Sequence, residues 1–301
     1  MTDSRRGLAE CGGAAALFGT TGLLAKIAHD EHVSLVTLLT GRFLIAAAAL
    51  WIIVLVTRRT LPSLKLAAAG LVLGATTFAA ASALNFRAID RMGPGLAALI
   101  GYCYPVLVTA GTVALGREDL TKRKVLALTI ALSGVGLLVA GQGFGAIDST
   151  GALCAFGGSA VYTVYLLVSS SLSHKVDALT FSALVATGAG AAFAAADLAQ
   201  GGSGVTSTSA LAVVVTLALI PTAFAISTFL RGVGRIGASR ASIVAAVEPA
   251  VAVCLGVTLL GESLLPIQVV GAALVIAAIA LLELKALRMP RRRRSMNPLA
   301  N

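Results

Sequence analysis

Charged residues are scarce in this sequence, and where they occur they are gathered into short clusters. Only 12% of the 301 residues are charged and 57% are hydrophobic, whereas about 25% of the residues in a soluble domain are charged. The clusters are separated by apolar stretches of roughly 17–25 residues, the length a helix needs to cross about 30 Å of hydrocarbon. The composition excludes a soluble globular domain and predicts an all-α integral membrane protein.

The residue groupings that disulfides, metal sites and enzyme active sites require are also missing. All four cysteines fall in apolar stretches without paired spacing, so we expect small apolar side chains and neither disulfides nor a metal site. The three histidines lie between the apolar stretches, and no paired acids lie within them. We therefore expect neither an enzyme nor a bound cofactor.

The apolar stretches predict ten membrane-spanning helices, with boundaries uncertain by a few residues. A small-xxx-small pair, Gly70 and Gly74, favours close helix packing within one chain over packing in a dimer, and the oligomeric state stays open. The expected spans are 7–28, 33–57, 66–88, 94–116, 123–141, 150–172, 178–199, 208–230, 239–260 and 266–286.

The net charge of +10 is explained by membrane orientation and does not require a nucleic-acid partner. With both termini in the cytoplasm, all Lys and Arg except Lys26, Arg42, Arg87 and Arg91 fall on the cytoplasmic side, as the positive-inside rule requires. Residues 289–301 are then a polybasic cytoplasmic tail, which we expect to contact anionic lipid. The prediction is a multi-pass protein of the cell membrane.

An internal repeat divides the chain into two halves, 1–144 and 145–288. A shift of 144 residues aligns 87–138 with 231–282 without a gap, and the two halves share charged, glycine and proline positions as well as apolar ones. The identical pairs include Arg87/Arg231, Arg91/Arg235, Gly93/Gly237, Pro105/Pro249 and Glu118/Glu262. Because each half holds five helices, the second must lie inverted relative to the first.

Loop charge supports the inversion independently. The loop "GREDLTKRK" after the fourth helix carries four cations, while its counterpart "LGESLLPIQ" after the ninth carries none. Matched sequence with opposite loop charge is what an inverted repeat predicts. The expected fold is therefore ten transmembrane helices arranged as two inverted five-helix repeats.

Several segments resemble the duplicated domains of EamA-type carriers in the drug/metabolite transporter superfamily. They are "LFGTTGLLAK", "GRFLIAAAAL", "MGPGLAALIGYCYPVLVTAGTVALGREDLTKRKVLALTIALSGVGLL" and "IGASRASIVAAVEPAVAVCLGVTLLGESLLPIQVVGAALVIAAIALL". The first departs from the family pattern, since Phe18 replaces the common tryptophan. The resemblance implies a central cavity lined mainly by helices one, three, four, six, eight and nine, and outward movement of small metabolites or toxic compounds.

Glu248 and Pro249 are the most informative residues for the site. Glu248 lies about nine residues into the ninth span, close to the bilayer midplane. A charged side chain there costs about 2.5–3.5 kcal/mol, so we expect it to face the bundle interior. Glu248 either exchanges protons or binds a substrate amine, or else forms a fixed pair with Arg42. Pro249 is expected to bend the helix and free the carbonyl near Ala245.

Other candidate site residues lie at similar depth. The position of Arg42 favours a structural contact over substrate binding, because the second helix is peripheral in the implied fold. Tyr104, next to Pro105, is the repeat counterpart of Glu248, while Tyr102 is expected on a different face of the same helix. Tyr162 and Tyr165 share one face of the sixth helix. Asn85 is a weaker polar candidate.

The sequence therefore predicts a secondary transporter that exports amino acids or other small metabolites by alternating access. It has no ATP-binding signature, so any pumping draws on an ion gradient, protons included, or on the gradient of the solute. The expected partners are a small-molecule substrate and the lipid bilayer. Uptake or exchange, drug efflux and a non-transporting sensor or assembly subunit remain as alternatives.

Overall fold

The computed structural model describes residues 3–140, 148–172, 175–202, 204–205, 207–260 and 265–283, and every regular element in them is a helix. The polybasic tail 289–301 lies outside these residues. The elements are α1 (Asp3–Phe18), α2 (Thr21–Asp30), α3 (Leu35–Val56), α4 (Leu64–Leu73), the π-helical segment η1 (Gly74–Phe78), α5 (Ala79–Gly101), α6 (Tyr104–Ala114), α7 (Lys122–Ala140), α8 (Ser149–Leu172), α9 (Ala178–Ala199), α10 (Thr208–Ala218), the π-helical segment η2 (Leu219–Phe224), α11 (Ala225–Ile236), α12 (Ala238–Val244), α13 (Val247–Leu260) and α14 (Pro266–Glu283).

Seven helical stretches among the described residues are long and apolar enough to cross a membrane. They match seven of the ten expected spans, so the prediction of an all-helical, multi-span membrane protein is confirmed. The seven are Asp3–Asp30, Leu35–Val56, Leu64–Met92, Lys122–Ala140, Ser149–Leu172, Ala178–Ala199 and Thr208–Ile236.

The remaining expected spans are shorter or interrupted. Instead of a single helix over 94–116, α5 continues to Gly101 and α6 starts at Tyr104; instead of one over 239–260, the chain forms α12 and α13. The last expected span is the shorter apolar helix α14. The first is also broken, between Phe18 and Thr21. Where the sequence predicts an interruption at 89–93, α5 is helical throughout.

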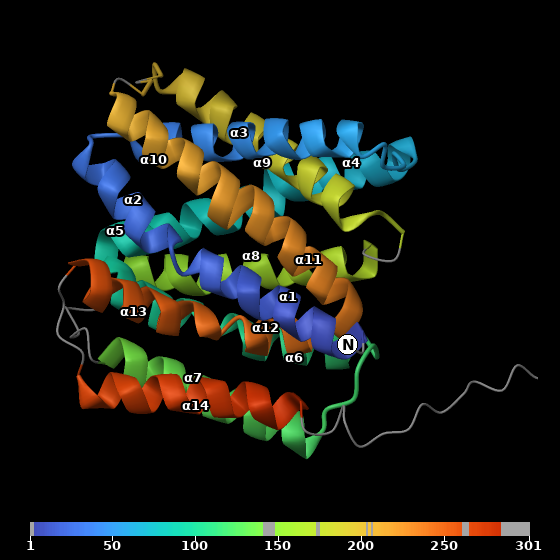
Figure 1. The fold of residues 1–301 in the computed structure, drawn as a ribbon, viewed down its shortest axis with the longest axis vertical. Helices are drawn as coiled ribbons and strands as arrows, with labels where there is room; N and C mark the ends of the chain where they lie inside the picture. The colour runs from blue at the N-terminus through green and yellow to red at the C-terminus, as the bar shows by residue number, and fades with distance from the viewer. Residues whose placement is uncertain are drawn as a thin grey trace, which may run out of the picture.

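Helices from the two halves pack against each other in repeat-related pairs (Figure 1). α7 lies along α14, and α3 lies along α9. The pairing of α5 with α8 is matched by that of α11 with α1. A shift of about 144 residues places α7 on α14 and α3 on α9. The same shift relates the α5–α8 pair to the α11–α1 pair. The core is therefore built from contacts between the halves, which a duplicated chain makes in duplicate.

Each half also carries a π-helical segment in the same place. η1 follows α4 in the third span, and η2 follows α10 in the eighth. Such one-turn irregularities are frequent at functional sites. At the first of them Gly70 and Gly74 lie against Leu184 and Val185 of α9, so the small-residue pair packs within the chain.

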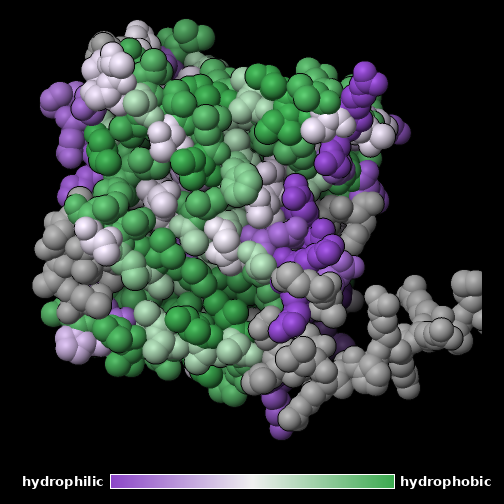
Figure 2. All heavy atoms as spheres, in the orientation of Figure 1, coloured by the Kyte–Doolittle hydropathy of each residue, from purple (hydrophilic) through white to green (hydrophobic). Residues whose placement is uncertain are grey.

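The surface is apolar around the middle of the bundle (Figure 2). Many large apolar side chains are exposed, among them Ile52, Leu153, Leu198 and Phe224, each more than 60% exposed. Contiguous apolar surface of this extent is unfavourable in water. It fits the hydrocarbon layer, with the hydrophilic residues gathered at the two ends of the bundle.

Candidate functional site

Three helix interruptions meet in the middle of the bundle. They fall at residues 19–20, 102–103 and 245–246. The last two are repeat counterparts, and each is followed by a proline, Pro105 or Pro249, in the first turn of the next helix. A proline is tolerated there because the first backbone N–H groups of a helix have no intrahelical partner. Interrupted helices of this kind form binding sites near the bilayer midplane in many carriers.

The structure corrects the expected effect of Pro249. It does not bend a continuous helix; it lies near the beginning of a separate one, α13. The Ala245 carbonyl is not free either, since it accepts a hydrogen bond of 3.0 Å from the Glu248 backbone N–H. What the interruption does is place the Glu248 side chain in the first turn of α13, where the positive end of the helix dipole favours a carboxylate.

The four tyrosines form one cluster at these interruptions. Ring centroids lie 5.9 Å apart for Tyr102 and Tyr104, 5.3 Å for Tyr104 and Tyr162, and 5.6 Å for Tyr162 and Tyr165. Tyr104 also reaches the second interruption, because its hydroxyl donates to the Ser242 carbonyl at 3.4 Å. Three of the predicted site residues are thus brought together by α6 and α8.

Placing Tyr102 on a different face from Tyr104 is wrong. The two-residue spacing argument assumes a continuous helix, whereas α5 ends at Gly101 and α6 begins at Tyr104. The turn between them brings both rings into the same cluster. The Tyr102 hydroxyl is buried and lies beside the Glu248 carboxyl group, with which it interacts.

Glu248 lies beside this cluster. Arg42, Tyr102, Tyr104 and Tyr162 are all within electrostatic range of its carboxyl group. Its backbone carbonyl packs against Gly19, where a Cβ atom would stand only 2.7 Å away. The interruption of the first span is therefore pressed against the beginning of α13, and only glycine fits at that contact.

Arg42 is held mainly by another partner. Its side chain is 7% exposed, its Nε donates to the Thr222 Oγ1 of η2 at 2.7 Å, and its guanidinium lies 5.2 Å from the centroid of the Phe43 ring. Arg42 and Glu248 are both described, and no ion pair within 4.0 Å joins them. A direct Arg42–Glu248 pair is thus absent from this structure, and Arg42 ties α3 to η2.

The structure adds aromatic residues that sequence reasoning missed. The ring centroid of Phe78 of η1 lies 4.8 Å from that of Tyr165. The Phe43 ring lies between Phe78 and Phe193 of α9, with centroid distances of 5.6 Å to Phe78 and 5.7 Å to Phe193. The ring row therefore continues from the tyrosines to α9. Asn85 does not join it, because its side chain is exposed and makes no hydrogen bond within the described residues. The only sequence signal for Phe78 is its neighbourhood of Gly74, Thr76 and Thr77.

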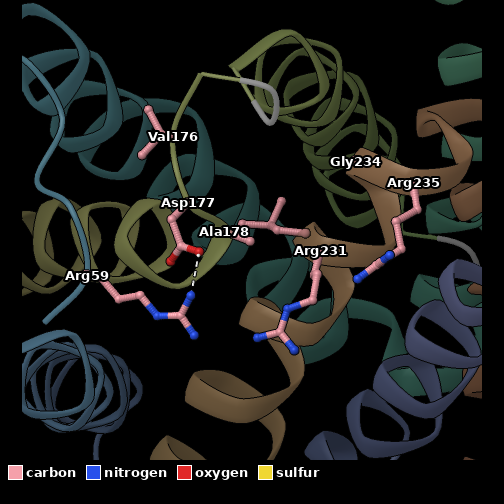
Figure 3. A pocket seen from close by; sticks show the side chains of 8 residues that line it. Arg59, Val176, Asp177, Ala178, Arg231, Gly234 and Arg235 are labelled. Carbon is pink, nitrogen blue, oxygen red and sulfur yellow. Dashed lines mark hydrogen bonds and ion pairs between the residues drawn. The ribbon is translucent and has the colours of Figure 1, made fainter. Parts of the chain in front are cut away.

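A cavity of about 500 Å³ opens where α3 ends and α9 begins, the side that we call the basic end (Figure 3). Three arginines surround it, Arg59, Arg231 and Arg235, together with Asp177. Arg59 lies 3.5 Å from Asp177, whose carboxylate also accepts from the N–H groups of Leu179 and Thr180. Arg235 donates a hydrogen bond of 3.0 Å to Asp3 and forms an ion pair with Glu10 at 2.9 Å.

A smaller cavity of about 200 Å³ opens at the other end of α3 and α9, the opposite end. It is lined by Leu35, Arg87, Asp90 and Phe193, among others. Leu35 is the first residue of α3 as Ala178 is of α9, and Arg87 is the repeat counterpart of Arg231. The two cavities are therefore related by the internal repeat, one at each end of the bundle.

The described residues offer no obvious metal site. No group of three or more His, Cys, Asp or Glu side chains among them could hold a metal ion. All four cysteines are free thiols in this structure.

Comparison with known proteins identifies the architecture. An uncharacterized transporter, YcbK, of Bacillus subtilis (strain 168) is 25% identical over 284 residues, which span 90% of each chain. A protein of known crystal structure matches with a TM-score of 0.83 at 20% identity, over 95% of this chain and 99% of the other, a likeness of fold. The model of the EamA-like transporter family matches twice, at residues 8–140 and 149–284. The chain therefore belongs to the EamA-like transporter family, with one EamA domain in each half.

Proposed function

We propose that this multi-pass transporter is a secondary carrier of the cell membrane that exports amino acids or other small metabolites by alternating access. In this proposal two inverted five-helix repeats, 1–144 and 145–288, exchange shapes, both termini lie in the cytoplasm, and Glu248 carries the coupling proton. The family to which the chain belongs comprises transporters and not enzymes.

The observation that carries the proposal is the pair of repeat-related cavities at opposite ends of α3 and α9. Alternating access requires a molecule that can open to either side with equivalent parts. The ion pairs support the same arrangement. Arg235 bonds Asp3 at the basic end, and its counterpart Arg91 lies 3.8 Å from Asp148 where α8 begins. Equivalent contacts at opposite ends are what an inverted repeat produces.

The central site lies between these ends. Tyr104, Tyr162 and Tyr165, joined by Tyr102, offer ring faces and hydroxyl groups to a small solute. Glu248 adds a carboxyl group without an ion-pair partner within 4.0 Å among the described residues. Moving a charged carboxylate within hydrocarbon is costly, so a proton that binds when the site closes and leaves when it opens would couple the two movements.

The test is transport into proteoliposomes of radiolabelled amino acids and related metabolites, with and without an imposed pH gradient. We expect a gradient to stimulate transport of at least one solute in the wild type. Glu248→Gln keeps the size of the side chain but cannot exchange a proton, so the stimulation should disappear. Glu31→Gln is the matched control, because Glu31 lies in the connection after α2, bonded to Ser207 and Ser209.

The outcomes separate coupling from structure. Loss of the stimulation in Glu248→Gln, with normal stimulation in Glu31→Gln, supports the coupling role. Equal transport with equal pH dependence in wild type and Glu248→Gln would show that Glu248 is structural. Absence of transport for every solute, in protein shown to be folded and correctly inserted, would contradict the carrier itself.

A further inference from the structure

The residues that line the cavity at the basic end are positively charged overall. Three arginines line it and one carboxylate, Asp177, so the lining carries a net charge of +2. Two of the arginines already have acidic partners: Arg59 has Asp177, and Arg235 has Asp3 and Glu10. The third, Arg231, has no ion-pair partner within 4.0 Å among the described residues.

Arg231 has no hydrogen bond or ion pair within the described part of the chain, and its side chain is exposed. In Figure 3 its guanidinium extends into the space between Arg59 and Arg235. Arg231 projects from α11, next to the buried Leu230. Two residues earlier on the same helix is Phe229, whose ring centroid lies 5.9 Å from that of Phe18 of α1. The same short helix therefore carries the free cation and reaches the helix that is interrupted beside Glu248.

The repeat-related cavity differs in the net charge of its lining, although Arg87, like Arg231, has no ion-pair partner within 4.0 Å among the described residues. Its arginine, Arg87, lines the same cavity as Asp90, which comes three residues later on α5. Residues three apart on a helix are neighbours. The position three after Arg231 is Gly234, which also lines the basic-end cavity. Arg87 and Asp90 together contribute no net charge, while Arg231 faces no such carboxylate.

We propose that the basic-end cavity binds the carboxylate or phosphate group of the small solute that this protein carries, with Arg231 as the main anchor. The inference rests on the proposed function. A volume of about 500 Å³ is within the roughly 300–1,000 Å³ typical of small-molecule sites. A guanidinium group donates two parallel hydrogen bonds to a carboxylate or phosphate. A cavity of one charge sign also concentrates ions of the other sign at its mouth.

The experiment measures binding to purified full-length protein in nanodiscs made only of phosphatidylcholine. The probes are succinate, L-glutamate and inorganic phosphate, and the uncharged or zwitterionic comparators are succinamide and L-glutamine. Thermal shift and calorimetric titration report affinity without requiring transport. The variants are Arg231→Gln, Arg231→Lys and, as the matched control, the repeat counterpart Arg87→Gln.

We expect at least one anion to bind the wild type and its comparator to bind more weakly. Losing the charge-assisted bonds of one arginine should weaken that binding about tenfold in Arg231→Gln. Arg231→Lys should retain part of the affinity, because the positive charge stays. Arg87→Gln should bind as the wild type does.

Three results would overturn the inference. One is no binding of any of the three anions; another is equal binding by wild type and Arg231→Gln. The third is a cavity that binds phosphatidylglycerol added to the nanodiscs when none of the free anions displaces this lipid. The cavity would then hold a lipid headgroup and not a solute. Anion binding that depends on Arg231 without transport of any solute would instead contradict the proposed function and leave the binding site intact.

Discussion

The two ends of the bundle share their packing and differ in their charge. At the basic end Gly7 of α1 lies against Arg235 and Ile236 of α11; at the opposite end Gly151 of α8 lies against Arg91 and Met92 of α5. In both places a Cβ atom on the glycine would approach the arginine Cβ to 2.9 Å. The close helix crossing is therefore present in both halves, with the same glycine and arginine at the contact.

The ionic contacts around these crossings are not preserved in the same way. Arg235 bonds two carboxylates, at 3.0 and 2.9 Å, whereas Arg91 lies 3.8 Å from one. The part of α8 equivalent to the surroundings of Glu10 includes Leu153 and Cys154 and no acid. Backbone packing tolerates little change, because interiors are close-packed, while charges near the membrane surface are free to follow topology and solute. The difference shows that the two halves have the same helix packing but different charged groups at their ends.

The largest expected effect tests the shared packing. Gly7→Ala and Gly151→Ala should each lower the free energy of unfolding by about 1–3 kcal/mol, because the added methyl group overpacks a helix crossing. Thermal unfolding in detergent measures both. Gly13→Ala is the control, since nothing lies within 4 Å of a Cβ atom there. A loss of stability in only one of the two variants would show that the two helix crossings are not equivalent.

A smaller effect sharpens the difference in charge. Arg235→Gln removes contacts with Asp3 and Glu10 and should cost about 1 kcal/mol or less, while Arg91→Gln should cost close to nothing, because exposed pairs contribute little. Both side chains of the Arg91–Asp148 pair are more than a third exposed. Thermal unfolding at low and high salt provides the comparison, since screening should reduce the Arg235 effect. Equal losses for the two variants would contradict the asymmetry.

The smallest effect concerns the opposite end and its pH dependence. Glu31, after α2, accepts hydrogen bonds from Ser209 at 2.7 Å and Ser207 at 2.8 Å, and these bonds lower its pKa from the ordinary value of 4.5. A lowered carboxyl pKa contributes stability that is present above the ordinary value and is lost as the pH falls through the lowered one.

Thermal unfolding of wild type and Glu31→Gln over a range of acidic pH checks this. The small stability difference between them should be constant at neutral pH and vanish as Glu31 becomes protonated. A difference that grows on acidification would show that the hydroxyl groups of Ser207 and Ser209 do not stabilise the carboxylate.

Much of the fold could be predicted from the sequence because membrane-spanning helices are specified locally. Length, apolar content and loop charge gave most spans to within a few residues, and identities such as Arg91/Arg235 and Pro105/Pro249 revealed the duplication. The interruptions at residues 19–20 and 102–103 escaped prediction, because the glycines and prolines near them also occur within continuous membrane-spanning helices. For the same reason, Tyr102 was assigned to the wrong face.

The candidate site was predictable in its residue types and not in its contacts. Glu248 and the tyrosines stand out as the polar groups that lie deep in apolar stretches. Their mutual placement depends on how α6, α8, α12 and α13 cross, which no single helix encodes. Arg42 illustrates the limit: its charge demands a partner, but only the packing of α3 against η2 selects Thr222.

By itself the sequence determined that this protein lies in a membrane, that it is helical, that it is duplicated and which deep polar residues it has. These properties follow from the length of the apolar stretches, the distribution of charge and the similarity between the two halves, all of which can be read along the chain. Only the tertiary structure decided that three helix interruptions meet near Glu248, that four tyrosines share one cluster and that Arg231 lines a cavity without pairing with a carboxylate. Such properties depend on distances between helices far apart in sequence, and close packing fixes those distances only when the whole bundle has formed.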